Sequence, residues 1–214
     1  MENESCKKSS CYSRHIVQCT PEVAFSGKMC EYVKAQTQVG RKQWVYSILS
    51  GEKELRNIKL RTDEFVLLPD IETRGAGNLV NWLAIFQDTE LRTIRDLRGC
   101  HIDLLRRVKM QCVERVKKEL SVDDSSIMCY FHYLPSVYQL HLHVCAPYGQ
   151  YTTMDICKVQ PIDNVISNLE IDSDYYQKAS ITTVVVGNND LLKIYGVKQG
   201  LRRPEVDSAE SASE

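Results

Sequence analysis

The sequence lacks the long apolar run that a membrane-spanning helix requires. Its 214 residues contain no uninterrupted apolar stretch that approaches ~18 residues. The N-terminal residues are acidic and polar and no apolar segment follows them, so we expect no secretory signal. A compact basic targeting cluster is missing as well. We therefore expect an intracellular protein that resides in the cytoplasm, with residence in the nucleus left open.

The sequence also has no excess of charge of either sign. It contains 27 lysine and arginine residues and 28 aspartate and glutamate residues. Because duplex nucleic acid is bound mainly through a positive field, we expect no bulk binding to it. Any anionic ligand must instead be recognised locally. The 43% of hydrophobic residues and 26% of charged residues are otherwise typical of an ordinary globular protein.

Motifs for disulfide frameworks, zinc fingers and dinucleotide binding are missing too. The nine cysteines are odd in number and form no C-x-x-C pair, which favours reduced, mostly buried thiols. The Gly75-Ala-Gly77 loop lacks the further glycine of a dinucleotide fingerprint, and we expect no cofactor. One cluster of soft ligands could surround zinc, although its spacing matches no standard finger or knuckle: Cys6, Cys11, His15 and Cys19. We expect no metal there.

The pattern along the chain indicates three parts. Residues 1–40 are polar without sustained periodicity, which indicates a leader or a remnant of an N-terminal domain. Residues 41–200 carry the periodic segments and form the main domain. Residues 201–214 are rich in acidic residues and serine, and we expect a disordered acidic tail.

Within the main domain, the pattern indicates both helices and strands. The strongest signal is the helical periodicity of His101–Leu120, whose basic residues we interpret as solvated surface. Further helices are expected at Trp44–Leu49, Leu79–Phe86, Asn164–Leu169 and Asp190–Ile194. Strands are expected at Asn57–Arg61, Phe65–Pro69, Ile127–Leu134, Tyr138–Ala146 and Ile181–Val186. This order predicts an α+β fold. Trp82, with its apolar neighbours, is expected in the core.

Histidine is scarce, but it is concentrated in one segment. Three of the five histidines, His132, His141 and His143, fall within twelve residues. Because side chains alternate along a strand, Gln139, His141, His143 and Cys145 are expected to share one face, with the two imidazoles ~6 to 7 Å apart. The apolar residues between them then face the core.

Two imidazoles on one strand face are open to three interpretations. They can ligate zinc or copper, although no third ligand of fixed spacing is nearby. They can simply form a polar sheet surface. The third interpretation is nucleophilic catalysis, in which a neutral imidazole attacks a phosphoryl group and holds it covalently until water discharges it. In that case the second ring nitrogen needs an acceptor, and the neighbouring histidine can donate to the phosphate oxygens.

The histidine segment resembles a known family. Gln139-Leu-His141-Leu-His143-Val is similar to the histidine-triad motif, and His132-Tyr-Leu-Pro-Ser-Val-Tyr138 resembles the branch of scavenger mRNA-decapping enzymes, the 7-methylguanosine-cap diphosphatases. The resemblance extends over roughly residues 40 to 195. It includes, in order, Gln43–Leu49, Phe65–Asp70, Arg92–Leu97, Asn168–Glu170 and Asp190–Lys193. A joint match of several segments is far more specific than any single motif.

The resemblance implies an α+β, HIT-like antiparallel sheet with packed helices over residues 41–200, an N-terminal domain that is largely missing, and a homodimer. It also implies hydrolysis of capped dinucleotides and short capped RNA after 3′-to-5′ mRNA decay, with release of 7-methylguanosine monophosphate. In this family's pattern His141 is the nucleophile that forms a nucleotidyl intermediate and His143 stabilises the triphosphate. The family's positions for the triphosphate fall on His132, Ser136 and Lys158, and those for the cap base fall on Trp44, Glu54, Asp70 and Ile71.

The cap-base positions make physical sense. N7-methylated guanine is positively charged, so an indole such as Trp44 adds cation-π attraction of ~1 to 2 kcal/mol to its stacking energy. A carboxylate such as Glu54 can accept hydrogen bonds from the base and neutralise it.

The sequence departs from the family's pattern at three positions. Gln139 replaces the first histidine of the triad, Val137 stands where the family has a tyrosine, and Glu72 stands where it has a phosphate-contacting lysine. Two alternatives to cap hydrolysis follow: a relative that binds cap nucleotides without cleaving them, and a general histidine-triad nucleotide hydrolase that ignores methylation.

Overall fold

The computed structural model describes residues 14–38, 43–51, 57–70, 80–147, 156–186 and 190–197. The predicted tail at 201–214 lies outside them. The strands are β1 (Arg14–Cys19), β2 (Leu60–Arg61), β3 (Phe65–Pro69), β4 (Val80–Phe86), β5 (Met128–His132), β6 (His141–Ala146), β7 (Val159–Pro161) and β8 (Ile181–Val186). The α-helices are α1 (Pro21–Ala24), α2 (Gly27–Gln38), α3 (Gln43–Leu49), α4 (Ile102–Glu119), α5 (Ile162–Ile171), α6 (Tyr175–Lys178) and α7 (Asp190–Ile194). Short 3-10 turns are η2 (Ile94–Asp96), η3 (Gly99–His101), η4 (Asp124–Ser126) and η5 (Ile156–Lys158).

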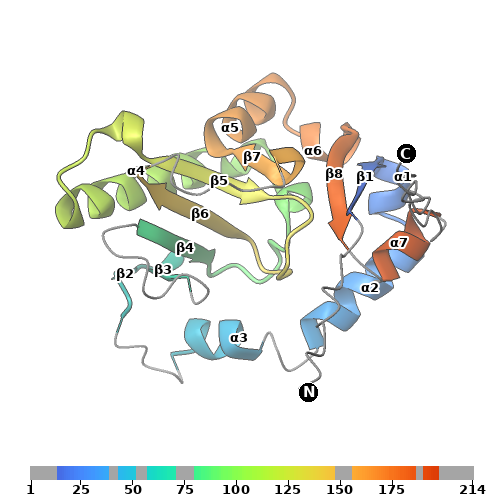
Figure 1. The fold of residues 1–214 in the computed structure, drawn as a ribbon, viewed down its shortest axis with the longest axis horizontal. Coiled ribbons are helices and arrows are strands. Elements are labelled where there is room, and N and C mark those ends of the chain that lie inside the picture. The colour runs from blue at the N-terminus through green and yellow to red at the C-terminus, as the bar shows by residue number, and fades with distance from the viewer. Residues whose placement is uncertain are drawn as a thin grey trace, which may run out of the picture.

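A six-stranded antiparallel sheet in the order β2-β3-β4-β6-β5-β7 forms the centre of the fold. Helix α5 lies above this sheet in Figure 1 and α3 lies below it. The predicted α+β class is thus confirmed. The strand with the two histidines, β6, lies inside the sheet between β4 and β5, so its backbone is fixed by neighbours on both sides.

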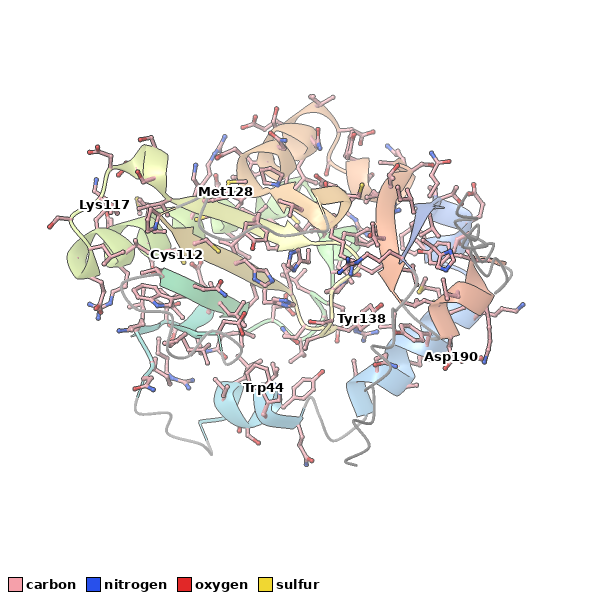
Figure 2. The ribbon with its side chains drawn as sticks, viewed as in Figure 1. Trp44, Cys112, Lys117, Met128, Tyr138 and Asp190 are labelled. Carbon is pink, nitrogen blue, oxygen red and sulfur yellow. The ribbon has the colours of Figure 1, made fainter. Side chains whose placement is uncertain are left out.

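One face of the sheet forms the main core with α4 and α5. The apolar residues of α4 recur at three- and four-residue steps, so that Leu105, Val108, Cys112 and Val116 are all buried. They pack in one cluster with sheet residues such as Leu142 and Val144 from β6. Cys112 and Met128 are labelled in Figure 2, on α4 and on β5. The apolar half of β6 is therefore committed to the core, and its other half faces the opposite side of the sheet.

The charged side of α4 is surface, as expected. Arg106 pairs with Glu170, Arg107 with Glu64, Lys109 with Asp163, Arg115 with Glu119, and Lys117 with Asp124. These side chains are exposed or half-buried, and such surface pairs each contribute ~1 kcal/mol or less.

One predicted element is wrong: residues 80–86 form strand β4 and not a helix. The segment Val-Asn-Trp-Leu-Ala-Ile-Phe is apolar at almost every position because the strand is central and both of its faces are covered. A continuous apolar run of this length fits a buried strand and a buried helix equally well. Trp82 is buried in the main core, as predicted.

The other expected elements are present with small changes at their ends. The helix at 44–49 is α3, and Gly51, which follows it, has a φ of +78° that suits glycine alone. The hairpin around Thr62 is β2 and β3, with the Thr62 hydroxyl accepting from the backbone of Glu64 and Phe65. Strand β6 begins at His141 and not at Tyr138.

Residues 14–38, polar and aperiodic in sequence, are well structured. Strand β1 pairs with β8 over six residues, and the two strands lie with α1, α2 and α7 on the right-hand side of Figure 1. Cys19 of β1 is completely buried and its thiol lies 2.9 Å from the Tyr133 hydroxyl. The division of the chain at residue 40 stays a prediction, but the pairing of β1 with β8 crosses it.

Arg95 joins these N-terminal residues to the sheet domain. Arg95 is buried, with 4% of the residue exposed. Its guanidinium donates to the carbonyls of Cys19, Tyr176 and Ala179 and to the Tyr133 hydroxyl, at 2.6 to 3.1 Å. A buried charge is tolerated only when its hydrogen bonds are satisfied. Arg95 therefore determines how three separate segments of the chain meet.

No helix in the part of the chain that the structure describes is long and apolar enough to cross a membrane. The seven cysteines in these ranges are free thiols, and four of them are buried: Cys19, Cys112, Cys129 and Cys145.

Candidate functional site

Three imidazoles gather on the face of the sheet opposite α4 and α5. His141 and His143 project from β6, and His132 projects from the end of β5, the next strand. The ring centroid of His143 lies 5.2 Å from that of His141 and 4.3 Å from that of His132. We call these three residues the histidine cluster. Alternation along β6 places the two motif histidines on one face, as predicted. The pairing of β5 with β6 brings His132 to the same face.

His141 is held in one orientation by the backbone just before it. Its Nδ1 lies 2.7 Å from the carbonyl oxygen of Gln139. A carbonyl can only accept, so Nδ1 carries the proton and donates, and Nε2 is left with its lone pair. The side chain is half-buried. This is the tautomer that an imidazole nucleophile requires.

Gln139 contributes to the site in a way that the sequence did not predict. It precedes the strand, so its amide is not part of the predicted face with His141 and His143. The amide Nε2 donates at 2.8 Å to the carbonyls of both Phe86 and Asp88. The side chain thus ties the turn before β6 to the end of β4, and the part of Gln139 that contacts His141 is its backbone carbonyl. The amide suits this anchoring role because its one nitrogen carries two N–H donors for the two carbonyls.

The surroundings keep the two motif histidines neutral. Burial lowers the pKa of His141 below its ordinary value, against a raising effect from the Gln139 carbonyl and the negative charge of Asp70. Burial also places the pKa of His143 well below its ordinary value, and His141 and His132 lower it further. Desolvation disfavours the charged form of an imidazole. Both motif histidines are therefore neutral at neutral pH.

His143 is fixed by packing and keeps one polar atom without a partner. Its ring stacks on Tyr130 with centroids 5.1 Å apart and an angle of 7° between the planes. The residue is 9% exposed, and its buried Nε2 has no hydrogen-bond partner among the residues that the structure describes. A buried nitrogen of this kind is costly unless a ligand satisfies it. With its proton on Nε2, the neutral ring can donate a hydrogen bond to an oxygen of a bound phosphate group.

Trp44 lies on the same face as the histidine cluster. It is half-buried on α3, beneath the sheet in Figure 2, and packs against an apolar cluster formed by Val45, Ile48, Val66, Leu68, Leu83 and Ile85. In the register of the sheet, Leu83 is opposite His143 and Ile85 is opposite His141. The apolar cluster under Trp44 is therefore the direct continuation of the histidine cluster across β4.

The remaining predicted site residues are placed unequally. Asp70 lies directly after β3, is half-buried, and its charge acts on His141. Lys158 ends η5, and its carbonyl accepts from the backbone of Tyr133, next to His132. Ser136 is exposed on the turn between β5 and β6. Glu54 and Ile71 lie outside the described residues, as does Glu72.

Two further residues of this face, Tyr130 and Asn81, were not singled out by the sequence, whereas Cys145 was expected on it. Tyr130 contacts two imidazoles, because its ring also lies 5.2 Å edge-on from that of His132. Its position two residues before His132 on one strand was the available signal. Asn81 is the polar member of the apolar run of β4, which the helix assignment concealed.

Metal ligation gains no support from this geometry. Within the described ranges, no group of three His, Cys, Asp or Glu side chains could hold a metal ion. Of the four soft ligands near the N-terminus, Cys19 is buried against Tyr133, and Cys6 and Cys11 lie outside the described residues.

A hollow lies on the other side of the sheet from the histidine cluster. It measures about 620 Å³ and is lined from α4, α5 and β5 by residues that include Lys109, Met110, Lys117 and Met128. Its two lysines are paired with Asp163 and Asp124. This hollow lacks the combination of neutral nucleophile and orienting acceptor that the histidine cluster provides.

Comparison with known proteins agrees with the family resemblance of the sequence. Residues 43–156 match the protein family described as "Scavenger mRNA decapping enzyme C-term binding". The m7GpppX diphosphatase of Rattus norvegicus is 31% identical over 157 residues, which are 71% of this chain and 47% of that protein. That of Caenorhabditis elegans is 32% identical over 163 residues, covering 71% and 50%. The Schizosaccharomyces pombe enzyme is 30% identical over 190 residues, covering 82% and 59%.

A solved structure described as the aprataxin orthologue Hnt3 in complex with DNA is similar at 17% identity, with a TM-score of 0.46, over 64% of this chain and 81% of that one. The chain spans about half the length of the decapping relatives that it matches. The family match covers more than half of the chain and includes Trp44, Asp70 and the histidine cluster. This chain therefore belongs to the scavenger mRNA decapping enzyme family, matching its C-terminal binding region.

Proposed function

We propose that the protein hydrolyses the triphosphate bridge of capped dinucleotides and short capped RNA and releases 7-methylguanosine monophosphate. The observation that carries this proposal is the fixed, neutral His141, whose Nδ1 is bound to the Gln139 carbonyl and whose Nε2 keeps its lone pair. Membership in the family supports the choice of substrate. A homodimer and cytoplasmic residence stay predictions.

The proposed reaction has two steps. In the first, Nε2 of His141 attacks the phosphorus nearest the methylated nucleoside. A P–N bond forms, the bond from that phosphorus to the bridging oxygen breaks, and the rest of the substrate leaves as a 5′-diphosphate. In the second, water attacks the same phosphorus and returns the electron pair of the P–N bond to Nε2.

The neighbours of His141 support these steps. The Nε2 of His143 is placed to bind phosphate oxygens, where negative charge develops in the transition state. Lys158 and His132 lie at the same edge of the sheet. Trp44 offers an aromatic surface to the cationic base at the other side of the cluster. The substrate would therefore lie across β4 and β6, with its base toward α3.

Methylation of the base is expected to determine the rate. We expect the protein to cleave a methylated capped dinucleotide with a kcat/KM at least ~10-fold above that of the unmethylated dinucleotide, since only the methylated base adds a cation-π term. Trp44→Ala should remove most of this difference. The assay measures monophosphate release from the two substrates. Equal rates on both in the wild-type protein would contradict cap selectivity and favour a general nucleotide hydrolase.

The pH dependence of the reaction follows from the neutral state of His141. Because the pKa of His141 is below its ordinary value, the nucleophile stays unprotonated as the pH falls through that ordinary value. We expect kcat/KM to be maintained there and to decline only at lower pH. The internal phosphates of a capped dinucleotide do not titrate in this range, so the acidic limb of a pH–rate profile reports on the enzyme. An acidic limb above the ordinary histidine pKa would contradict this prediction.

One observation favours a second candidate, the binding of cap nucleotides without cleavage. Gln139 cannot supply a proton, because an amide does not titrate in this range, and its side chain is committed to Phe86 and Asp88. If protonation of the leaving group depended on that position, the protein would bind the cap and not cleave it. A titration with 7-methylguanosine monophosphate beside the product assay separates the two: saturable binding with no product would establish sequestration.

A further inference from the structure

A chain of side chains runs from the histidine cluster to Asp70 across three strands. Tyr130 of β5, stacked on His143, has its hydroxyl 3.7 Å from the Cys145 thiol of β6. This thiol donates to the Asn81 Oδ1 of β4 at 3.3 Å, and the Asn81 Nδ2 donates to the Asp70 Oδ2 at 3.4 Å. The chain of contacts is therefore continuous from the stacked imidazole to the carboxylate.

The sheet register makes this arrangement rigid. Asn81 and Cys145 are directly opposite each other on β4 and β6. The backbone N–H of Asp70 also donates to the Asn81 carbonyl at 2.9 Å, so both the main chain and the side chain of Asp70 are bound to one residue. Cys145 is 2% exposed. Tyr130, Asn81 and Cys145 are thus each held in a strand, and Asp70 is held by its two hydrogen bonds to Asn81.

The chain has a definite direction. The thiol has a single proton, and Asn81 Oδ1 accepts it, so the Asn81 amide is oriented with its NH₂ toward Asp70. An inverted amide would point its oxygen at the carboxylate and repel it. Cys145 therefore favours the orientation of Asn81 in which the amide NH₂ meets Asp70.

We propose that Asn81 and Cys145 are positioning residues for recognition of the methylated base, because together they fix the Asp70 carboxylate relative to the histidine cluster. This inference rests on the proposed function, in which the ligand carries a cationic base. A carboxylate held in one direction attracts such a base more strongly than it attracts the neutral one. The chain therefore affects selectivity for the base.

The test is a binding titration of four proteins: wild type, Asn81→Ala, Cys145→Ala and Cys145→Ser. Each is titrated with 7-methylguanosine monophosphate and with guanosine monophosphate, followed by tryptophan fluorescence. We expect Asn81→Ala to bind the methylated nucleotide about 10-fold more weakly, as for a lost hydrogen bond to a charged group, and the unmethylated one within about twofold. Cys145→Ala should lose part of the preference, and Cys145→Ser, whose hydroxyl can still donate, should retain it.

The outcomes separate this inference from the proposed function. If wild type shows no preference for the methylated nucleotide, the proposed function fails. If wild type shows the preference and both alanine variants keep it unchanged, the positioning role is overturned and the proposed function stands. Cooperative thermal unfolding identifies variants that fold. If Asn81→Ala does not fold, the comparison of Cys145→Ala with Cys145→Ser decides: a loss in the alanine variant alone supports the positioning role, and equal preference in both overturns it.

Discussion

Replacing His141 by asparagine should reduce turnover of a capped dinucleotide by roughly 10⁴-fold or more. The physical reason is that an amide nitrogen has no available lone pair, so no bond to phosphorus can form. Asparagine can still donate a hydrogen bond to the Gln139 carbonyl, where His141 Nδ1 is now 2.7 Å away. Binding of 7-methylguanosine monophosphate should therefore change by no more than ~3-fold. Product release by chromatography measures the first effect and a fluorescence titration the second.

A histidine outside the cluster serves as the matched control. His15 lies on β1, opposite Val185 of β8, far along the chain from the motif. His15→Asn should keep wild-type turnover. A His141→Asn protein that turned over substrate at the wild-type rate would remove His141 from the reaction.

Replacing Arg95 by methionine should lower the free energy of unfolding by ~3 kcal/mol or more. Methionine roughly fills the volume but donates nothing, so the carbonyls of Cys19, Tyr176 and Ala179 lose the partner that they share. Each buried acceptor left unsatisfied costs ~1 to 3 kcal/mol. Urea denaturation monitored by circular dichroism measures the difference as a shift of the midpoint.

Arg106→Met provides the control for this prediction. The Arg106 side chain is 54% exposed and pairs with Asp103 and Glu170 at the surface of α4. Its loss should cost ~1 kcal/mol or less, since exposed ion pairs contribute little. Equal destabilisation by the two substitutions would show that the buried hydrogen bonds of Arg95 contribute no more to the free energy of unfolding than an exposed ion pair.

Periodicity identifies elements with one buried face, whereas elements with two buried faces show no period. Strand β3 could be predicted only as a short apolar run, and the longer run of β4 was assigned to a helix. Helix α4 shows a three- and four-residue periodicity because one side meets the sheet and the other meets water. Strand β4 has neighbours on both edges and apolar clusters on both faces, so its period is erased. Residues 14–38 were difficult for another reason: their place in the fold depends on pairing with β8, more than 160 residues later in the chain.

The candidate site shows the same division. Alternation along β6 predicted that His141 and His143 share a face, because this depends only on the period of a strand. The approach of Tyr130 to His143 depends on the register between β5 and β6, which no local pattern contains. The hydrogen bond of the Gln139 side chain likewise depends on the position of Phe86, where β4 ends. Its backbone carbonyl, and not its amide, is the group that orients His141.

The central claim is that His141 forms a covalent bond to the phosphorus next to the methylated nucleoside. The most direct measurement is a single-turnover reaction with enzyme in excess over a capped dinucleotide labelled at that phosphate, quenched within the first turnover and digested for mass spectrometry. We expect a 7-methylguanylyl group, labile to acid, on the peptide that contains His141, and no such group in the His141→Asn protein. Product formation with no label on any histidine, or with the label on His132 or His143, would contradict it.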